Sequence, residues 1–119
     1  MTTKSKESKS LGMTIYGLLR EAQASEAREP RETPRYSFFR TTAIYKGKTC
    51  YSGFSRDISP TGIGLLHNFN LIPGQVEISI STECGYSVRI RTQILWCTPC
   101  GEGWYISGGK FLGIAGVRA

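Results

Sequence analysis

The sequence predicts an all-β protein, a six-stranded antiparallel β-barrel preceded by one short N-terminal α-helix. Three observations predict it. The 119 residues suit a single domain with one core. Six short segments with strand-like composition follow one another after residue 35 and are separated by turn residues. No helical periodicity lies between them, so neighbouring strands should pair antiparallel, and closing the sheet into a barrel would remove its exposed edges.

The residues before the barrel divide into three parts. Residues 1–10 mix Lys, Ser, Thr and Glu without apolar periodicity, which predicts a disordered tail. Residues 11–25 carry apolar side chains at helical spacing, which predicts an amphipathic helix that packs on the barrel or docks on a partner. The barrel domain then covers 26–119. It begins with a charged arm, 26–34, which Pro30 and Pro34 keep extended.

The six predicted strands are short and show the alternation of half-buried β-structure. In one of them, Val76, Ile78 and Ile80 share a face. In the next, Val88, Ile90, Ile94 and Trp96 share a face that is opposite to Arg89, Arg91 and Gln93, so we expect these apolar side chains to point into the core. The predicted strands cover residues 36–45, 49–56, 63–66, 76–80, 88–96 and 104–106.

The net charge of +6 is concentrated in one part of the chain. Residues 28–56 hold seven basic and two acidic side chains, whereas 57–119 hold four of each. An anionic partner should therefore meet the protein near 28–56. No apolar run approaches the roughly 20 residues of a spanning helix, so no membrane insertion is expected. The four cysteines have no secretory context, and reduced thiols in a cytoplasm are expected.

Two short segments carry candidate binding chemistry. In the arm, Arg31 and Arg35 lie four residues apart, with Arg28 just before them. The guanidinium fork donates paired hydrogen bonds to phosphate and to the O6 and N7 acceptors of guanine. A ligand with two phosphates and two guanines would use all of these capacities, although arginines at this spacing also occur as ordinary solvated charges.

The second segment, 57–62, predicts a bend between two strands. Asp57 and Ser59 have side chains that hydrogen-bond nearby backbone amides, and Pro60 restricts φ. Gly62 permits positive φ or the close approach of a ligand. A carboxylate also accepts hydrogen bonds from the N1–H and N2–H₂ edge of guanine. A turn without a ligand and a ligand-binding loop both fit this segment.

Together, the RxxxR pair and the DxSxxG segment about 20 residues later resemble the PilZ domain, over roughly residues 28–112. The closing part, with Ile94-Leu95-Trp96, Gly103-Trp104-Tyr105 and the segment 108–113, looks like the final hairpin of that family. The resemblance implies a PilZ-like barrel that binds cyclic di-GMP. Arg31 and Arg35 would hold phosphate and guanine, Asp57 and Ser59 would contact the base edge, and Gly62 would let the loop close.

The resemblance also implies a role. We expect a bacterial, cytoplasmic second-messenger receptor, not an enzyme, that needs no cofactor beyond its ligand cyclic di-GMP and acts through a downstream protein. The arm would wrap over the nucleotide. Many family members carry a further arginine directly before the first motif arginine, where this chain has Pro30. Whether one nucleotide or a stacked pair binds therefore stays open.

Particular residues would also suit two other functions. Basic and aromatic side chains at 36–46, among them Tyr36, Phe38, Phe39 and Tyr45, would also suit a barrel that binds single-stranded nucleic acid, although alternating aromatics are more often core. A PilZ-like adaptor without nucleotide binding would dock through residues 11–22. Both are less favoured than the receptor.

Metal and catalytic sites are not expected. Cys97 and Cys100 form a lone CxxC, which we interpret as a cysteine-containing turn, and Cys84 lies at the far end of the same predicted strand. His67 has no second histidine to make a metal site and should be structural or exposed. The acidic residues are spread over separate turns and strands, so no catalytic constellation is expected.

Overall fold

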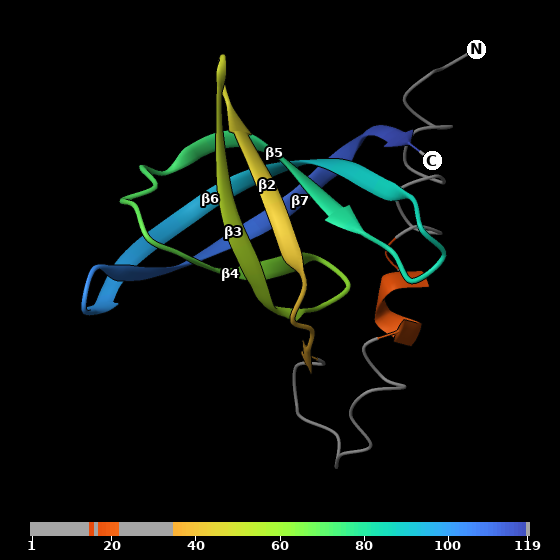
Figure 1. The fold of residues 1–119 in the computed structure, drawn as a ribbon, viewed down its shortest axis with the longest axis horizontal. Coiled ribbons are helices and arrows are strands. Elements are labelled where there is room, and N and C mark those ends of the chain that lie inside the picture. Colours follow the sequence, from red (N-terminus) through yellow and green to blue (C-terminus); the bar gives the residue numbers. More distant parts are fainter. Residues whose placement is uncertain (1–14, 16, 22–34, 119) are drawn as a thin grey trace.

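The computed structural model describes residues 15, 17–21 and 35–118. The predicted tail (1–10), the whole of the predicted arm (26–34) and much of the predicted helix (11–25) lie outside these residues. Among the described residues, seven strands form one antiparallel sheet (Figure 1). They are β1 (Tyr36–Ser37), β2 (Thr41–Lys46), β3 (Thr49–Ile58), β4 (Gly62–His67), β5 (Gly74–Ser81), β6 (Ser87–Gly101) and β7 (Trp104–Arg118).

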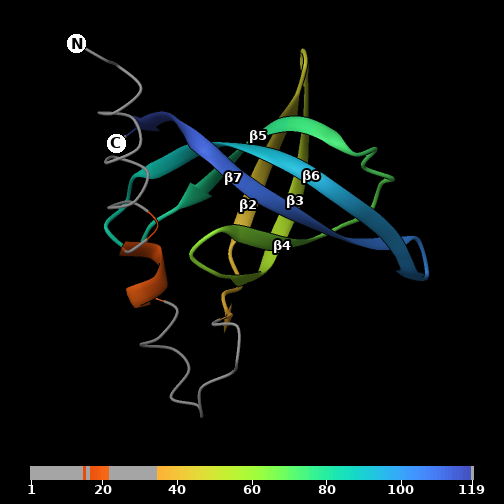
Figure 2. The same cartoon turned by 180° about the vertical axis from the view of Figure 1, so that it is seen from behind.

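The sheet closes into a barrel of six strands. Hydrogen bonds join the strands in the order β3-β2-β5-β6-β7-β4, and β4 pairs back with β3 (Figures 1 and 2). The short β1 pairs only with β3, beyond the end of β2. The predicted all-β class with a six-stranded antiparallel barrel is therefore confirmed. Closure pairs both edges of each barrel strand, which leaves few unpaired backbone groups to attract another chain.

The first predicted strand, 36–45, is wrong as a single element because residues 38–40 interrupt it. β2 pairs with β3 up to Thr41↔Phe54, and β1 pairs with β3 from Ser37↔Asp57. In the gap, the buried Ser55 hydroxyl donates to the Phe38 carbonyl and accepts from the Arg40 amide at 2.9 Å. The Ser55 side chain thus satisfies the Phe38 carbonyl and the Arg40 amide, while the Phe38 amide and the Arg40 carbonyl still bond to the β3 backbone.

The core follows the alternation of the strands. Val76, Ile78 and Ile80 are buried, as their shared face predicted. Ile44, Ile78 and Ile90 are fully buried register partners on neighbouring strands. They form a cross-strand row of the kind that stabilises a sheet.

The last two strands are longer than predicted. β7 covers 15 residues, whereas the sequence pattern indicated only 104–106. Cys97 and Cys100 lie within β6, so the interpretation of this segment as a turn is wrong. The turn is formed instead by Glu102 and Gly103, both with positive φ. Glycines interrupt the apolar pattern of β7, and this is why its alternation was not recognised.

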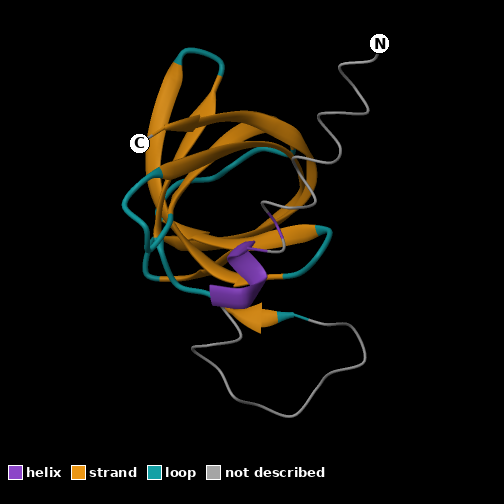
Figure 3. Cartoon of the chain, turned by 90° about the vertical axis from the view of Figure 1, so that its right-hand side faces the viewer, coloured by secondary structure: helices purple, strands orange, loops and turns teal. Residues whose placement is uncertain are grey.

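The described part of the N-terminal helix packs on the barrel. Residues 17–21 are helical, as is Ile15, and this segment lies at the rim of one end of the barrel (Figure 3). Ile15 and Leu18 are buried in the same core as the strand residues, and Leu19 packs beside them. The apolar stripe thus covers the chain's own barrel.

Candidate ligand-binding cleft

A cavity of about 560 Å³ opens on the outer surface of the barrel, where β3, β4, β6 and β7 lie side by side. Four of the five residues predicted as site residues line it. The lining residues are Arg35, Arg56, Asp57, Ser59, Thr61, Gly62, Ile63, Leu95, Trp96, Gly108, Gly109 and Lys110. Residues more than 70 positions apart in the chain therefore share one surface.

The floor of this cleft is a cross-strand row of four register partners. Asp57 on β3 is opposite Gly64 on β4, Gly64 is opposite Gly108 on β7, and Gly108 is opposite Trp96 on β6. A Cβ on Gly64 would lie 2.5 Å from Asp57 Oδ1, and a Cβ on Gly108 would lie 2.5 Å from Trp96 Nε1. The carboxylate and the indole therefore lean over the two glycines from opposite sides.

Trp96 differs from the sequence expectation. Its pattern placed it on the core face with Ile94, but its side chain is 44% exposed and faces the cleft. The register of β6 against β7 shifts between Ile94 and Trp96, which inserts an extra residue into the strand. Such a bulge reverses the alternation beyond it. Leu95 and Trp96 both become exposed as a result.

Arg35 and Asp57 form an ion pair in the cleft through Arg35 Nη2 and Asp57 Oδ1. The side chains are 36% and 23% exposed, so the pair lies at the surface and is open to a ligand. Arg35 comes just before β1, and the pairing of Ser37 with Asp57 brings the two segments together. An arginine beside a carboxylate presents donors and an acceptor in one place.

Ser59 holds the bend between β3 and β4. It is buried, and its Oγ accepts hydrogen bonds from the amides of Thr61 (3.3 Å) and Gly62 (3.1 Å). The Ser59 amide donates to the Gly62 carbonyl at 2.9 Å, and the Phe111 amide donates to the Thr61 carbonyl at 2.8 Å. Hydrogen bonds therefore hold the bend together internally and also join it to β7.

Gly62 is required for close approach rather than for an unusual backbone angle. Its φ is not positive, and a Cβ there would collide with the carbonyl oxygen of Gly109 on β7. The sequence allowed a positive φ or the close approach of a ligand, and the structure shows a different reason. The approach is to the protein's own backbone, which brings the bend against the cleft floor.

The cleft is cationic. Arg35, Arg56 and Lys110 line it with a single carboxylate, that of Asp57. Arg56 and Lys110 are exposed, and Arg56 Nη1 lies 3.3 Å from the position of a Cβ on Gly64. Cations gathered around a concave floor raise the local potential and attract anions.

The structure thus brings Arg35, Asp57, Ser59 and Gly62 together, whereas Arg31 and Arg28 lie outside the described residues. Sequence reasoning missed Trp96, Lys110 and the paired glycines Gly64 and Gly108. The glycine-rich segment 108–113 was the available signal, but only the register shows which glycines face the ligand side.

The other residues considered from the sequence are His67, the aromatic side chains of 36–46 and the four cysteines. His67 is buried, and Phe38 is buried in the core, so the 36–46 aromatics do not form one surface for nucleic acid. All four cysteines are free. Within the described ranges, no three metal-ligating side chains cluster, and no helix has the length and apolar character needed to cross a bilayer.

Comparison with known proteins places the fold. The family model described as "PilZ domain" matches residues 29–117, which is most of the chain. The chain belongs to the PilZ family. Among curated proteins, none gives a significant match to this PilZ chain.

Solved structures support the same fold. The PilZ chain is similar to the Bacillus subtilis inhibitor of motility (MotI/DgrA), with a TM-score of 0.58 and 14% sequence identity. The match covers 74% of this chain and 45% of that one, so this chain spans less than half of its length. At this identity the likeness shows the fold alone.

Proposed function

We propose that this PilZ chain is a cytoplasmic receptor for cyclic di-GMP that relays the level of the second messenger to a protein partner and is not an enzyme. The observation that carries the proposal is the convergence of Arg35 and Asp57, 22 residues apart in sequence, in one cationic cleft. Membership of the family, whose members are typically such receptors, supports it. The four free cysteines fit a reducing compartment.

The chemistry of the cleft suits a guanine dinucleotide. Asp57 supplies the acceptor that the N1–H and N2–H₂ edge of guanine requires. Trp96 offers an exposed aromatic face for base stacking. The two glycines between them leave room for the Asp57 carboxylate and the Trp96 indole, which line the cleft where a guanine base would bind. Arg35, Arg56 and Lys110 would neutralise the phosphates. In this proposal Arg31 adds a further phosphate or guanine contact, and Ser59 and Gly62 hold the bend.

Isothermal titration calorimetry with cyclic di-GMP tests the proposal. Arg35→Ala should weaken binding by about 10- to 100-fold, because a charge-assisted hydrogen bond contributes about 1.5–3 kcal/mol. Arg89→Ala is a matched control, since Arg89 also pairs with one carboxylate, Glu77, at similar exposure but outside the cleft. Equal losses for the two variants, or no binding by the wild-type protein, would contradict the proposal, and the latter would favour a nucleotide-independent adaptor.

A second titration tests the base. Cyclic di-AMP has the same phosphates but lacks the N1–H and N2–H₂ donors, so it should bind the wild-type protein more weakly than cyclic di-GMP. Asp57→Ala should reduce this difference, because the variant has no acceptor for the guanine edge. Equal affinity of the wild-type protein for the two dinucleotides would remove the role given to Asp57.

A further inference from the structure

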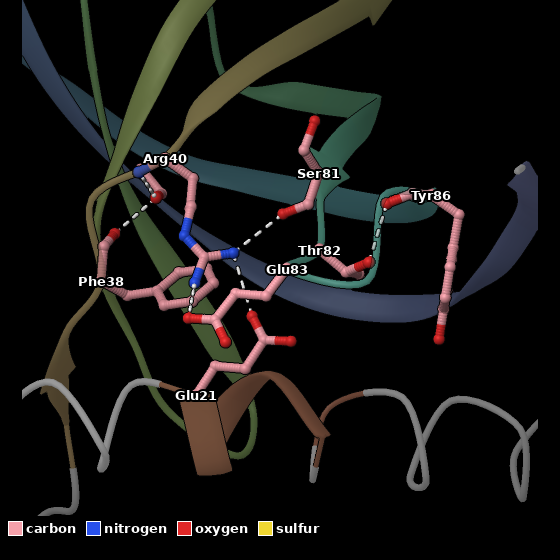
Figure 4. A network of polar contacts seen from close by, with 8 residues as sticks. Glu21, Phe38, Arg40, Ser81, Thr82, Glu83 and Tyr86 are labelled. Atoms are coloured by element: carbon pink, nitrogen blue, oxygen red, sulfur yellow. Dashed lines mark hydrogen bonds and ion pairs between the residues drawn. The ribbon is translucent and has the colours of Figure 1, made fainter.

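Arg40 joins three separate parts of the molecule (Figure 4). Its Nη1 lies 2.9 Å from Glu21 Oε1 in the N-terminal helix and donates to the Ser81 carbonyl at 3.0 Å. Its Nη2 lies 3.3 Å from Glu83 Oε2 in the turn after β5. Arg40 itself lies between β1 and β2, five residues after Arg35. Arg40 is not among the residues that line the cleft.

The contacts of Arg40 differ in how far they are exposed to solvent. The Arg40 and Glu21 side chains are 21% and 19% exposed, whereas Glu83 is 66% exposed. The guanidinium also lies over the Phe38 ring, with Cζ 4.6 Å from the ring centre. Exposed ion pairs contribute little because water and salt screen them, and partial burial reduces that screening. The Arg40–Glu21 ion pair is therefore screened less than the Arg40–Glu83 pair, which serves as its internal control.

The backbone around Arg40 connects this contact to the cleft. Ser55 holds residues 38–40 through the Phe38 carbonyl and the Arg40 amide, and the Phe38 amide donates to the Arg56 carbonyl at 2.9 Å. β1 lies directly before residues 38–40 in the chain and has only two register pairs, Tyr36↔Ile58 and Ser37↔Asp57. A strand this short is weakly held by its own pairing, so the anchor at 38–40 strongly affects where Arg35 lies.

We propose that Arg40 is a positioning residue for the cleft, because it fixes β1, and with it Arg35, to the docked N-terminal helix through Glu21. The proposal rests on the proposed function and names how that same site is regulated. A cleft arginine that is already in place costs less ordering when ligand binds. Helix docking and ligand binding are then positively coupled, and the coupling acts equally in both directions.

Matched neutral variants test the coupling in the full chain. Glu21→Gln should weaken cyclic di-GMP binding about fivefold, at the lower end of typical coupling between sites. Glu83→Gln removes an equally charged but exposed partner of the same arginine, and should change affinity by less than about twofold. Equal affinities of the wild-type protein and Glu21→Gln would overturn the proposal, as would equal losses for the two variants.

Amide hydrogen exchange of residues 17–21 gives the reciprocal readout, which a purely structural role would not change. Saturating cyclic di-GMP should slow exchange of these helical amides in the wild-type protein and have little effect in Glu21→Gln. Ligand-induced slowing of the same size in both proteins would overturn the coupling. If the wild-type protein binds no cyclic di-GMP, the proposed function fails and the coupling falls with it; if it binds but Glu21→Gln binds equally, the coupling alone fails.

Discussion

At the scale of single residues, the molecule uses polar groups mainly to replace missing backbone hydrogen bonds. Ser55 does so at the break between β1 and β2, and Ser59 does so at the bend before β4. His67 does so at the end of β4. Its Nδ1 lies 2.8 Å from the Phe69 carbonyl, which only accepts, so Nδ1 carries the proton. Its Nε2 then accepts from the Ser107 hydroxyl at 2.8 Å.

This environment predicts how stability depends on pH. Burial lowers the pKa of His67 below its ordinary 6.5, and the hydrogen bond to Phe69 only partly opposes this. As pH falls below 6.5, the unfolded chain gains a proton that the folded protein resists. The contribution of neutral His67 is thus complete above pH 6.5 and is lost as pH falls toward the folded pKa.

Chemical denaturation at about pH 7.5 and about pH 5.5 measures this effect. His67 is the one histidine in the chain, so His67→Gln removes the histidine titration and leaves every other ionisable side chain in place. When the pH is lowered from about 7.5 to about 5.5, the free energy of unfolding of the wild-type protein should decrease relative to that of His67→Gln. A constant difference would mean that His67 does not resist protonation.

At the scale of elements, paired glycines and one bulge build the cleft. The bulge in β6 turns Trp96 outward, and Gly64 and Gly108 make room for Asp57 and Trp96 to lean over the floor. β6 contributes Ile90 and Ile94 to the core. The next two residues of β6, Leu95 and Trp96, line the cleft.

Gly108→Ala tests this arrangement. The new Cβ would lie 2.5 Å from Trp96 Nε1 and 2.8 Å from Cζ2, so the indole must move. We expect cyclic di-GMP affinity to fall by about 5- to 100-fold, because a base stacked on an aromatic ring gains about 1–3 kcal/mol. Gly116→Ala on the same strand is the control, since its Cβ would meet nothing within 4 Å. Unchanged affinity in Gly108→Ala would mean that the position of Trp96 does not affect binding.

At the scale of the whole molecule, the closed barrel and the docked helix share one core. Ile15 and Leu18 from the helix belong to the same buried cluster as Ile44, Ile78 and Ile90 from the strands. Because the sheet is closed, none of the six barrel strands can detach without breaking two pairings. We therefore expect the barrel to unfold as one cooperative unit.

Urea denaturation of two isoleucine variants examines this expectation. Ile78→Ala, at a fully buried position, should lower the free energy of unfolding by about 2–5 kcal/mol without changing the m-value. Ile72→Ala, at a side chain that is 62% exposed, should change it by less than about 0.5 kcal/mol. A second transition in either variant would show that part of the barrel unfolds separately.

The amino-acid sequence by itself determined the all-β class, the core faces of β5 and the first half of β6, and the candidate residues Arg35, Asp57, Ser59 and Gly62. These features depend on alternation and on residue chemistry within a few positions, which are local. Cross-strand register decided the break at 38–40, the outward turn of Trp96 and the glycine floor, and the packing of the helix on the barrel decided the contact of Arg40 with Glu21. Register depends on which distant residues pair, and one inserted residue reverses every face beyond it. Only the tertiary structure could therefore show the cleft.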